Sequence, residues 1–210
     1  MAEDVLIARA WTGIGRKLSD LRYVEVGGNH PRYLSVTYSL YKQGARGVVV
    51  EPNPTLAPLW GMFRPRDVLV RAGASWMKKA SIATYWSFRR HTLNTFDEAS
   101  AKAMIKIHAD ESPAKLKLPL LPWADILAQG DAPELVVLDT EGLDEKLLKA
   151  FPFESLKPTL FCVETLLYDI SGAPRKIAPM FKLMEKQGYM VLADTLVNTV
   201  FVRRDVWVER

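Results

Sequence analysis

The sequence predicts an α/β sandwich built on a mostly parallel sheet with a reversed strand near its C-terminal end. Continuous apolar, β-branched runs are typical of strands buried on both faces of a parallel sheet. Two later runs, 189–192 and 198–202, are separated by 193–197, which is too short for a crossover helix and predicts an antiparallel hairpin. Strands that alternate with helices and end in a hairpin indicate this fold class. The five apolar runs before the hairpin are 22–26, 47–50, 67–70, 135–138 and 159–163.

Helices are predicted in three of the intervals between strands. The first begins near Pro31 and ends at Gly44, because proline is tolerated in a first helical turn and glycine is favoured after a last one. The second follows Gly142, and the third ends at Gly188. Each places its packing side chains on one face at helical spacing: Leu34, Thr37, Tyr38 and Tyr41; Leu143, Leu147, Leu148 and Phe151; Ile177, Met180, Phe181 and Met184.

A chain of 210 residues fits one domain with embellishments, since domains average about 150 residues. We therefore expect a single domain over 1–210, with a helical extension in 1–21. The interval 76–133 is long for a connection between two strands, and insertions of this length usually carry function. Its pattern predicts one strand and two helices: 82–88, 99–107 and a short helix from Trp123.

Composition excludes several classes of protein. Hydrophobic residues make up 49% and charged residues 25%, a balance that excludes a disordered chain, a collagen and a coiled coil. No apolar run reaches about 18 residues, so no transmembrane helix and no membrane partner is expected. The acidic start, Met1 to Asp4, is unlike a signal peptide. The single cysteine, Cys162, excludes an internal disulfide and fits a reducing, cytoplasmic setting. The net charge is +4, but the basic residues are scattered, so we expect no nucleic-acid partner.

Ligands of open parallel sheets bind beyond the carboxyl ends of the strands, so the residues that follow the strands are candidates for a site. Glu25 is followed after one residue by Gly27, Gly28 and Asn29. Two glycines in a strand-to-helix turn let a ligand approach the backbone closely; the alternative is a tight turn without a ligand. The spacing lacks the third glycine of a dinucleotide fingerprint, which disfavours a nicotinamide dehydrogenase.

The second strand ends in Glu51, Pro52 and Asn53. A carboxylate at that position suits the two hydroxyls of a ribose, although a solvated strand-end acid is the simpler alternative. The glycine turn and this acid together indicate an adenosine-type ligand. Because no phosphate cradle accompanies them, S-adenosylmethionine fits better than NAD.

Three more acids follow later strands: Asp139 and Glu141 after the fourth, and Glu164 after the fifth. They could converge on one cleft and hold the ammonium of the ligand, a hydroxyl substrate or Mg²⁺, which prefers carboxylate oxygens. Asp144 and Glu145 fit better as charges that compensate a helix dipole. His30 and His91 are the histidines closest to these loops, as general bases or in structural roles.

Several segments resemble, in the same order, the motifs of the FkbM-type S-adenosylmethionine-dependent methyltransferases. The resemblance extends over about 23–203. Three residues depart from the family pattern: Glu25 stands where the family usually has Asp, Leu143 where it has His, and Asp144 where it has Glu. The matching segments are 23–31, 47–54, 64–67, 93–96, 138–144, 163–164 and 198–202.

The resemblance implies a Rossmann-like class I methyltransferase sandwich with a mostly parallel seven-stranded sheet and an antiparallel C-terminal strand. It implies methyl transfer to an oxygen, and we expect the acceptor to be a hydroxyl of a small molecule or glycan. Separately, we expect the 76–133 insertion to contribute to the acceptor site, and a homodimer is among the expected assemblies. Asp139, Glu141 and His30 are the expected catalytic residues. The expected cofactor-binding residues are Glu25, Gly27, Gly28, Asn29, Glu51, Pro52, Asn53, Ser75 and Asp139.

Two alternatives keep this fold: an N-methyltransferase, and an S-adenosylmethionine-binding module without catalysis. The intact strand-end residues Glu25, Gly27, Glu51 and Asp139 argue against the second. No metal ligands are assigned from the sequence, and Mg²⁺ stays open as an additional cofactor.

Overall fold

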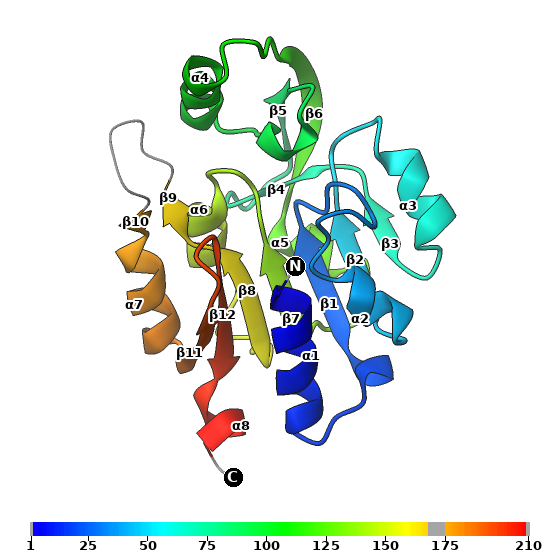
Figure 1. The fold of residues 1–210 in the computed structure, drawn as a ribbon, viewed down its shortest axis with the longest axis vertical. Helices are drawn as coiled ribbons and strands as arrows, with labels where there is room; N and C mark the ends of the chain where they lie inside the picture. The colour runs from blue at the N-terminus through cyan, green and yellow to red at the C-terminus, as the bar shows by residue number, and fades with distance from the viewer. Residues whose placement is uncertain (1, 168–174, 209–210) are drawn as a thin grey trace.

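A seven-stranded sheet with the order β11-β12-β8-β7-β1-β2-β3 forms the centre of the protein (Figure 1). The computed structural model describes residues 2–167 and 175–208. Strand β12 is antiparallel to both of its neighbours, and the other paired strands of this sheet run parallel. The expected fold class is therefore confirmed. The strands are β1 (Arg22–Val26), β2 (Arg46–Val50), β3 (Val68–Val70), β7 (Leu135–Leu138), β8 (Leu160–Glu164), β11 (Tyr189–Asp194) and β12 (Asn198–Arg203).

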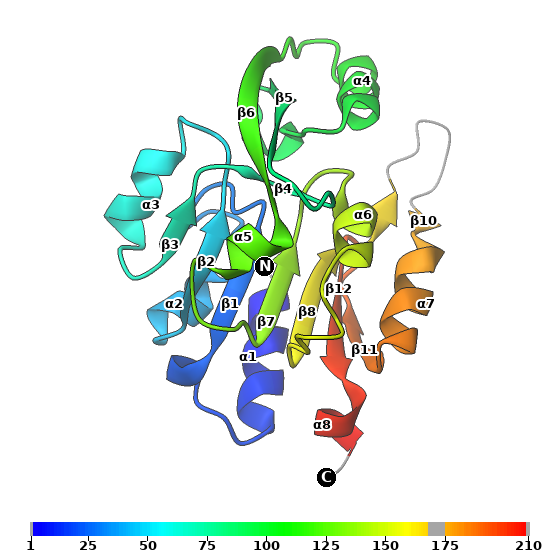
Figure 2. The same cartoon turned by 180° about the vertical axis from the view of Figure 1, so that it is seen from behind.

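Both faces of this sheet are covered by helices, which explains why its strands read as continuous apolar runs. Figures 1 and 2 show α1 in front of the sheet and α5 behind it. Along β1, Tyr23 packs with Trp11 on one face, whereas Val24 and Val26 pack with Trp123 on the other. The helices are α1 (Glu3–Gly13), α2 (Tyr38–Lys42), α3 (Ala57–Phe63), α4 (Glu98–Ile107), α5 (Trp123–Leu127), α6 (Asp144–Lys149), α7 (Ala178–Lys186) and α8 (Arg204–Val208).

The helix predicted between Pro31 and Gly44 is wrong in its first half, because only α2 at its C-terminal end is helical. Leu34 has a φ of 56°, which no helix accommodates, and its side chain is 70% exposed rather than packed. The guanidinium of Arg64 donates hydrogen bonds to the Pro31 carbonyl and the Ser35 hydroxyl. Bonds from a distant, buried side chain therefore hold this segment as a loop. The helices predicted after Gly142 and before Gly188 are confirmed as α6 and α7.

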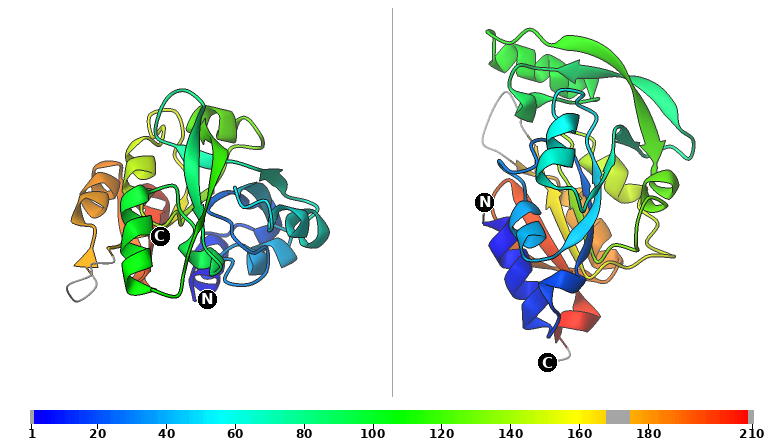
Figure 3. Two further views of the ribbon diagram at one scale, coloured as in Figure 1. Left: turned by 90° about the horizontal axis from the view of Figure 1, so that it is seen from above. Right: turned by 90° about the vertical axis from the view of Figure 1, so that its right-hand side faces the viewer.

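The interval between the third and fourth sheet strands builds a separate lobe. It contains a second sheet with the order β4-β6-β5, formed by β4 (Gly73–Ser75), β5 (Ser81–Ser87) and β6 (Ala114–Pro122), together with α4 and the 3-10 helix η2 (His91–Leu93). Figure 3 shows this lobe above the carboxyl ends of the main strands. The predicted strand and helices of this interval are confirmed as β5, α4 and α5, but β6 is missing from the prediction.

Short elements complete the chain. A 3-10 helix, η1 (Leu18–Asp20), follows α1, and β9 (Leu166–Leu167) pairs antiparallel with β10 (Arg175–Lys176). In residues 2–167 and 175–208, no helix has the length and apolar character needed to cross a membrane.

Candidate active site

Two neighbouring cavities lie at the carboxyl ends of the main strands. The first, of about 390 Å³, is lined by the ends of β1, β2 and β7 and by residues of α1, β5 and the β11–β12 hairpin. The second, of about 400 Å³, lies against α4 and α6. Thr95 and Glu141 line both cavities, so the two spaces adjoin at these residues.

The turn after β1 forms one wall of the first cavity. Gly27 has a φ of 85°, and a Cβ atom there would lie 1.7 Å from the Asp139 carbonyl oxygen. A Cβ atom on Gly28 would lie 2.3 Å from Val49 Cγ1. The chain's own close packing therefore requires both glycines, which agrees with the tight turn that the sequence left as an alternative to a ligand site. Both glycines line the cavity with their backbone.

Glu51 joins the turns that follow β1 and β2. Its Oε2 accepts a hydrogen bond from the Asn29 backbone N–H at 2.6 Å, and its Oε1 accepts one from the Asn53 backbone N–H at 2.7 Å. Burial raises the pKa of the Glu51 carboxyl to about 7, against the lowering effect of these two bonds. The carboxylate is thus fixed in position at the cavity wall beside Pro52, which also lines it.

Glu25 lies deeper, in a buried network. Its carboxylate accepts a hydrogen bond from the Thr37 hydroxyl and lies 3.6 Å from the Arg64 guanidinium. Arg64 also pairs with Asp67 at 2.6 Å. Burial raises the pKa of Glu25, and the positive charge of Arg64 opposes that shift. Glu25 lines the cavity as expected, while one of its oxygens is committed to holding the 29–37 loop.

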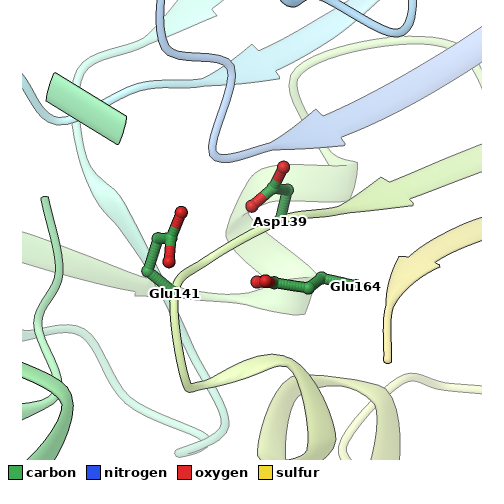
Figure 4. Close-up of side chains that lie close together, drawn as sticks. All are labelled: Asp139, Glu141 and Glu164. Atoms are coloured by element: carbon green, nitrogen blue, oxygen red, sulfur yellow. The ribbon is translucent and has the colours of Figure 1, made fainter. Parts of the chain in front are cut away.

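Asp139, Glu141 and Glu164 converge, as their positions after neighbouring strands indicated. One oxygen from each carboxylate lies within 4.8 Å of the other two, and Figure 4 shows all three pointing toward a common space. Burial is the main cause that raises the pKa of Asp139 to about 7, of Glu141 to about 9 and of Glu164 to about 11, and repulsion from the neighbouring Asp144 adds to each shift.

Asp144 does more than compensate a helix dipole, which corrects the sequence interpretation. It is 3% exposed, and its carboxylate accepts hydrogen bonds from the backbone N–H groups of Thr140 and Gly142 at 3.0 and 3.4 Å. The Thr95 hydroxyl donates to the Glu141 carbonyl at 2.9 Å. These bonds fix the loop that carries Glu141. Glu145 bonds Lys149 on the helix surface, as a simple helix charge would.

The two candidate histidines differ in position. His91 lines the first cavity, and its Nδ1 lies 3.2 Å from Asn53 Nδ2. His30 is not among the residues that line either cavity. Its Nδ1 accepts the backbone N–H groups of Arg32 and Tyr33, both at 3.1 Å, because the 29–37 loop turns back on itself there. The structure therefore gives no support to the expected catalytic role of His30.

Two expected cofactor residues, Ser75 and Asn53, are not among the residues that line the first cavity. The Ser75 hydroxyl accepts the Met77 backbone N–H, and its neighbours Gly73 and Ala74 line the cavity instead. Asn53 is 1% exposed and accepts the Thr55 backbone N–H.

Sequence reasoning missed other lining residues. Glu3 of α1 is 6% exposed, and its carboxylate accepts hydrogen bonds from the Thr195 hydroxyl and the Asn198 amide. Nothing in a short N-terminal helix marks Glu3 as a cavity residue, because only the packing of α1 on the hairpin brings it there. Tyr85 and Phe96 of the lobe also line this cavity.

No protein-family model and no curated protein sequence matches the chain. Its structure is similar to those of S-adenosylmethionine-dependent methyltransferases. The 1,6-didemethyltoxoflavin-N1-methyltransferase of Burkholderia thailandensis, solved with 1,6-didemethyltoxoflavin and S-adenosylhomocysteine, is 11% identical, with a TM-score of 0.45 over 97% of this chain and 77% of that chain.

A TehB-like methyltransferase from Corynebacterium glutamicum is 11% identical, with a TM-score of 0.45 over 96% of this chain and 86% of that chain. The mitomycin 7-O-methyltransferase MmcR is 14% identical, with a TM-score of 0.45 over 97% of this chain and 53% of that chain. Because these identities and TM-scores are low, the function proposed below rests on the cavities and their side chains. Membership of the FkbM-type family stays an expectation from the sequence resemblance.

Proposed function

We propose that the chain is an S-adenosylmethionine-dependent methyltransferase that methylates a hydroxyl group of a small molecule or glycan. The observation that carries this proposal is the charge of the first cavity. Among the residues that the structure describes, no lysine or arginine lines it. Five carboxylates do: Glu3, Glu25, Glu51, Asp139 and Glu141. Such a lining attracts the positive sulfonium of S-adenosylmethionine and repels the pyrophosphate of a nicotinamide dinucleotide.

The turns after β1 and β2 would hold the cofactor. The Gly27–Asn29 backbone would pass beneath its methionine and sugar parts, and Glu51 would accept hydrogen bonds from the two ribose hydroxyls. The bonds from Asn29 and Asn53 already fix the Glu51 carboxylate in one orientation. Less conformational freedom is then lost on binding.

The second cavity would hold the acceptor. It adjoins the first cavity at Thr95 and Glu141, and Ser100, Ala103 and Met104 of α4 also line it. This arrangement supports a contribution of the 76–133 insertion to the acceptor site. A nucleophile in the second cavity would approach the methyl group near Asp139 and Glu141, and its orientation there would supply much of the acceleration.

Methyl transfer with a panel of hydroxyl- and amine-bearing compounds tests this proposal. We expect S-adenosylhomocysteine to form with hydroxyl acceptors and the product to be a methyl ether. An N-methylated product would show that the acceptor is an amine rather than a hydroxyl compound. Folded protein that binds S-adenosylhomocysteine and releases none with any acceptor would contradict the enzymatic function.

A matched pair of variants tests the assignment of the two cavities. Ala103→Phe fills the second cavity and should lower turnover at least about tenfold, with S-adenosylhomocysteine affinity unchanged, because the acceptor is displaced. Lys102→Phe on the exposed face of α4 is the control. Equal turnover in both variants would place the acceptor elsewhere.

A further inference from the structure

Three carboxylates meet where the two cavities adjoin. Asp139 directly follows β7, Glu141 stands two residues later in the same loop, and Glu164 ends β8. Their nearest oxygens all lie within 4.8 Å of one another. Oxygen ligands of Mg²⁺ or Ca²⁺ stand at about 2.0–2.6 Å from the ion. The spacing of the three carboxylates therefore matches the space around one such ion.

Glu164 gives a separate reason to place a ligand here. It comes from a different strand, is only 5% exposed and points toward Asp139 and Glu141 (Figure 4). In the described part of the chain, no lysine, arginine or histidine pairs with Glu164, and no side chain donates a hydrogen bond to its carboxylate. A buried carboxylate without a counter-charge is costly to ionise, so a positive partner would stabilise the ionised form of this side chain.

Two lysines of neighbouring elements, Lys146 of α6 and Lys176 of β10, are engaged elsewhere. Lys176 donates hydrogen bonds to the Thr165 and Thr199 hydroxyls and pairs with Asp194 at 2.7 Å. Lys146 lies 3.7 Å from Asp97 and over the ring of Trp76. Neither forms an ion pair with the three carboxylates, so a cation bound from outside the described chain is the partner that would keep all three groups ionised.

We propose that Asp139, Glu141 and Glu164 bind one divalent cation of the Mg²⁺ type, and that the acceptor coordinates it through a hydroxyl and a neighbouring oxygen. The cation part stands on the carboxylates alone, whereas the acceptor part rests on the proposed function. Three carboxylates occupy three positions of an octahedron. The remaining positions leave room for two acceptor oxygens and water, which makes vicinal diols and related chelating compounds the expected substrate class.

The transfer step follows from this geometry. The coordinated hydroxyl loses its proton to water more readily, because the cation stabilises the resulting oxyanion. The oxygen's electron pair then forms a bond to the methyl carbon, while the carbon–sulfur bond breaks and its electron pair returns to sulfur. The products are a methyl ether and S-adenosylhomocysteine.

Titration of the full chain with Mn²⁺, followed by electron paramagnetic resonance, tests the cation site, since Mn²⁺ takes the same oxygen ligands. We expect one Mn²⁺ per chain, displaced by excess Mg²⁺. Glu164→Gln should weaken binding about tenfold or more. The control is Glu145→Gln, which removes a nearby charge but no ligand and should change the affinity less than about twofold. If Glu164→Gln does not fold, Glu141→Gln replaces it with the same expected loss.

The outcomes separate the cation from the proposed function when S-adenosylhomocysteine binding is measured on the same samples. Wild-type protein that binds S-adenosylhomocysteine but no Mn²⁺ overturns the cation site and leaves the proposed function standing. Mn²⁺ binding without S-adenosylhomocysteine binding supports the cation site and overturns the proposed function. Equal Mn²⁺ affinity in wild type and Glu164→Gln also overturns the site. For the acceptor part, EDTA should abolish turnover of vicinal diols and Mg²⁺ should restore it; turnover unaffected by EDTA would overturn that part.

Discussion

Gly27 and Glu51 hold together the turns that line the first cavity. Gly27 allows the turn after β1 to approach the Asp139 carbonyl, which brings β1 and β7 together at their carboxyl ends. Glu51 then ties that turn to the turn after β2 through the Asn29 and Asn53 backbone. The chemistry of the cavity therefore depends on two single-residue constraints that can be tested separately.

Gly27→Ala should lower the free energy of unfolding by roughly 2–5 kcal/mol, because a positive φ and a forced close contact both add strain. Urea denaturation measures the change. Gly61→Ala is the matched control, since a Cβ atom there meets nothing within 4 Å and the site is helical. The control should be neutral or stabilising. Similar losses in both variants would contradict this account of the β1 turn.

Binding of S-adenosylhomocysteine should weaken as the pH falls from 8 to 6. The pKa of Glu51 is raised to about 7 by burial, so the fraction of ionised carboxylate falls through this range. The ribose hydroxyls donate to the ionised form, and the affinity should fall by up to about tenfold per pH unit below 7.

The pH profile of Glu51→Gln provides the control for this prediction. Asp139, whose pKa is also raised to about 7, lies at the same cavity, so only the difference between the two profiles reports Glu51. We expect weaker binding and a flatter profile in Glu51→Gln. Identical slopes in the two proteins would place the ribose away from Glu51.

Among the elements, the loop between β1 and α2 shows what a distant side chain does to local structure. Arg64 lies beyond α3, is 1% exposed and reaches Glu25, Asp67 and the 29–37 loop. The helical spacing of Leu34 and Tyr38 predicts a longer helix. This prediction fails because the spacing of residues in the sequence carries no information about hydrogen bonds from a distant side chain such as Arg64. Strand β6 was missed although its residues 114–118 alternate between polar and apolar, which is a strand pattern.

Arg64→Leu should destabilise the protein by about 3–5 kcal/mol, because it leaves the buried carboxylates of Glu25 and Asp67 without their counter-charge. Thermal or urea unfolding gives the change. Arg16→Leu, which removes an exposed ion pair with Glu134, should cost no more than about 1 kcal/mol. A loss of that small size for Arg64→Leu would show that the network does not hold the loop.

At the scale of the whole molecule, two cavities adjoin at the carboxyl ends of the strands, and strand-end acids line both of them. Most of this was predictable: Glu51, Asp139, Glu141 and Glu164 all follow apolar strands, and the ends of parallel strands meet at one edge. The contribution of Glu3 to the first cavity could not be predicted, since it depends on how α1 packs against the C-terminal hairpin. The second cavity also depends on where α4 packs. The sequence predicts that this segment is helical but does not predict its position against the sheet.

Calorimetric titration of S-adenosylhomocysteine and, separately, of NADH into the wild-type chain tests the central claim most directly. The carboxylate-lined cavity predicts one S-adenosylhomocysteine per chain with a dissociation constant of about micromolar, near −8 kcal/mol. It predicts no measurable NADH binding, since the pyrophosphate would face carboxylates and no lysine or arginine of the lining. Folded protein that binds NADH, or that binds neither compound, would contradict the claim that this cavity is a methyltransferase cofactor site.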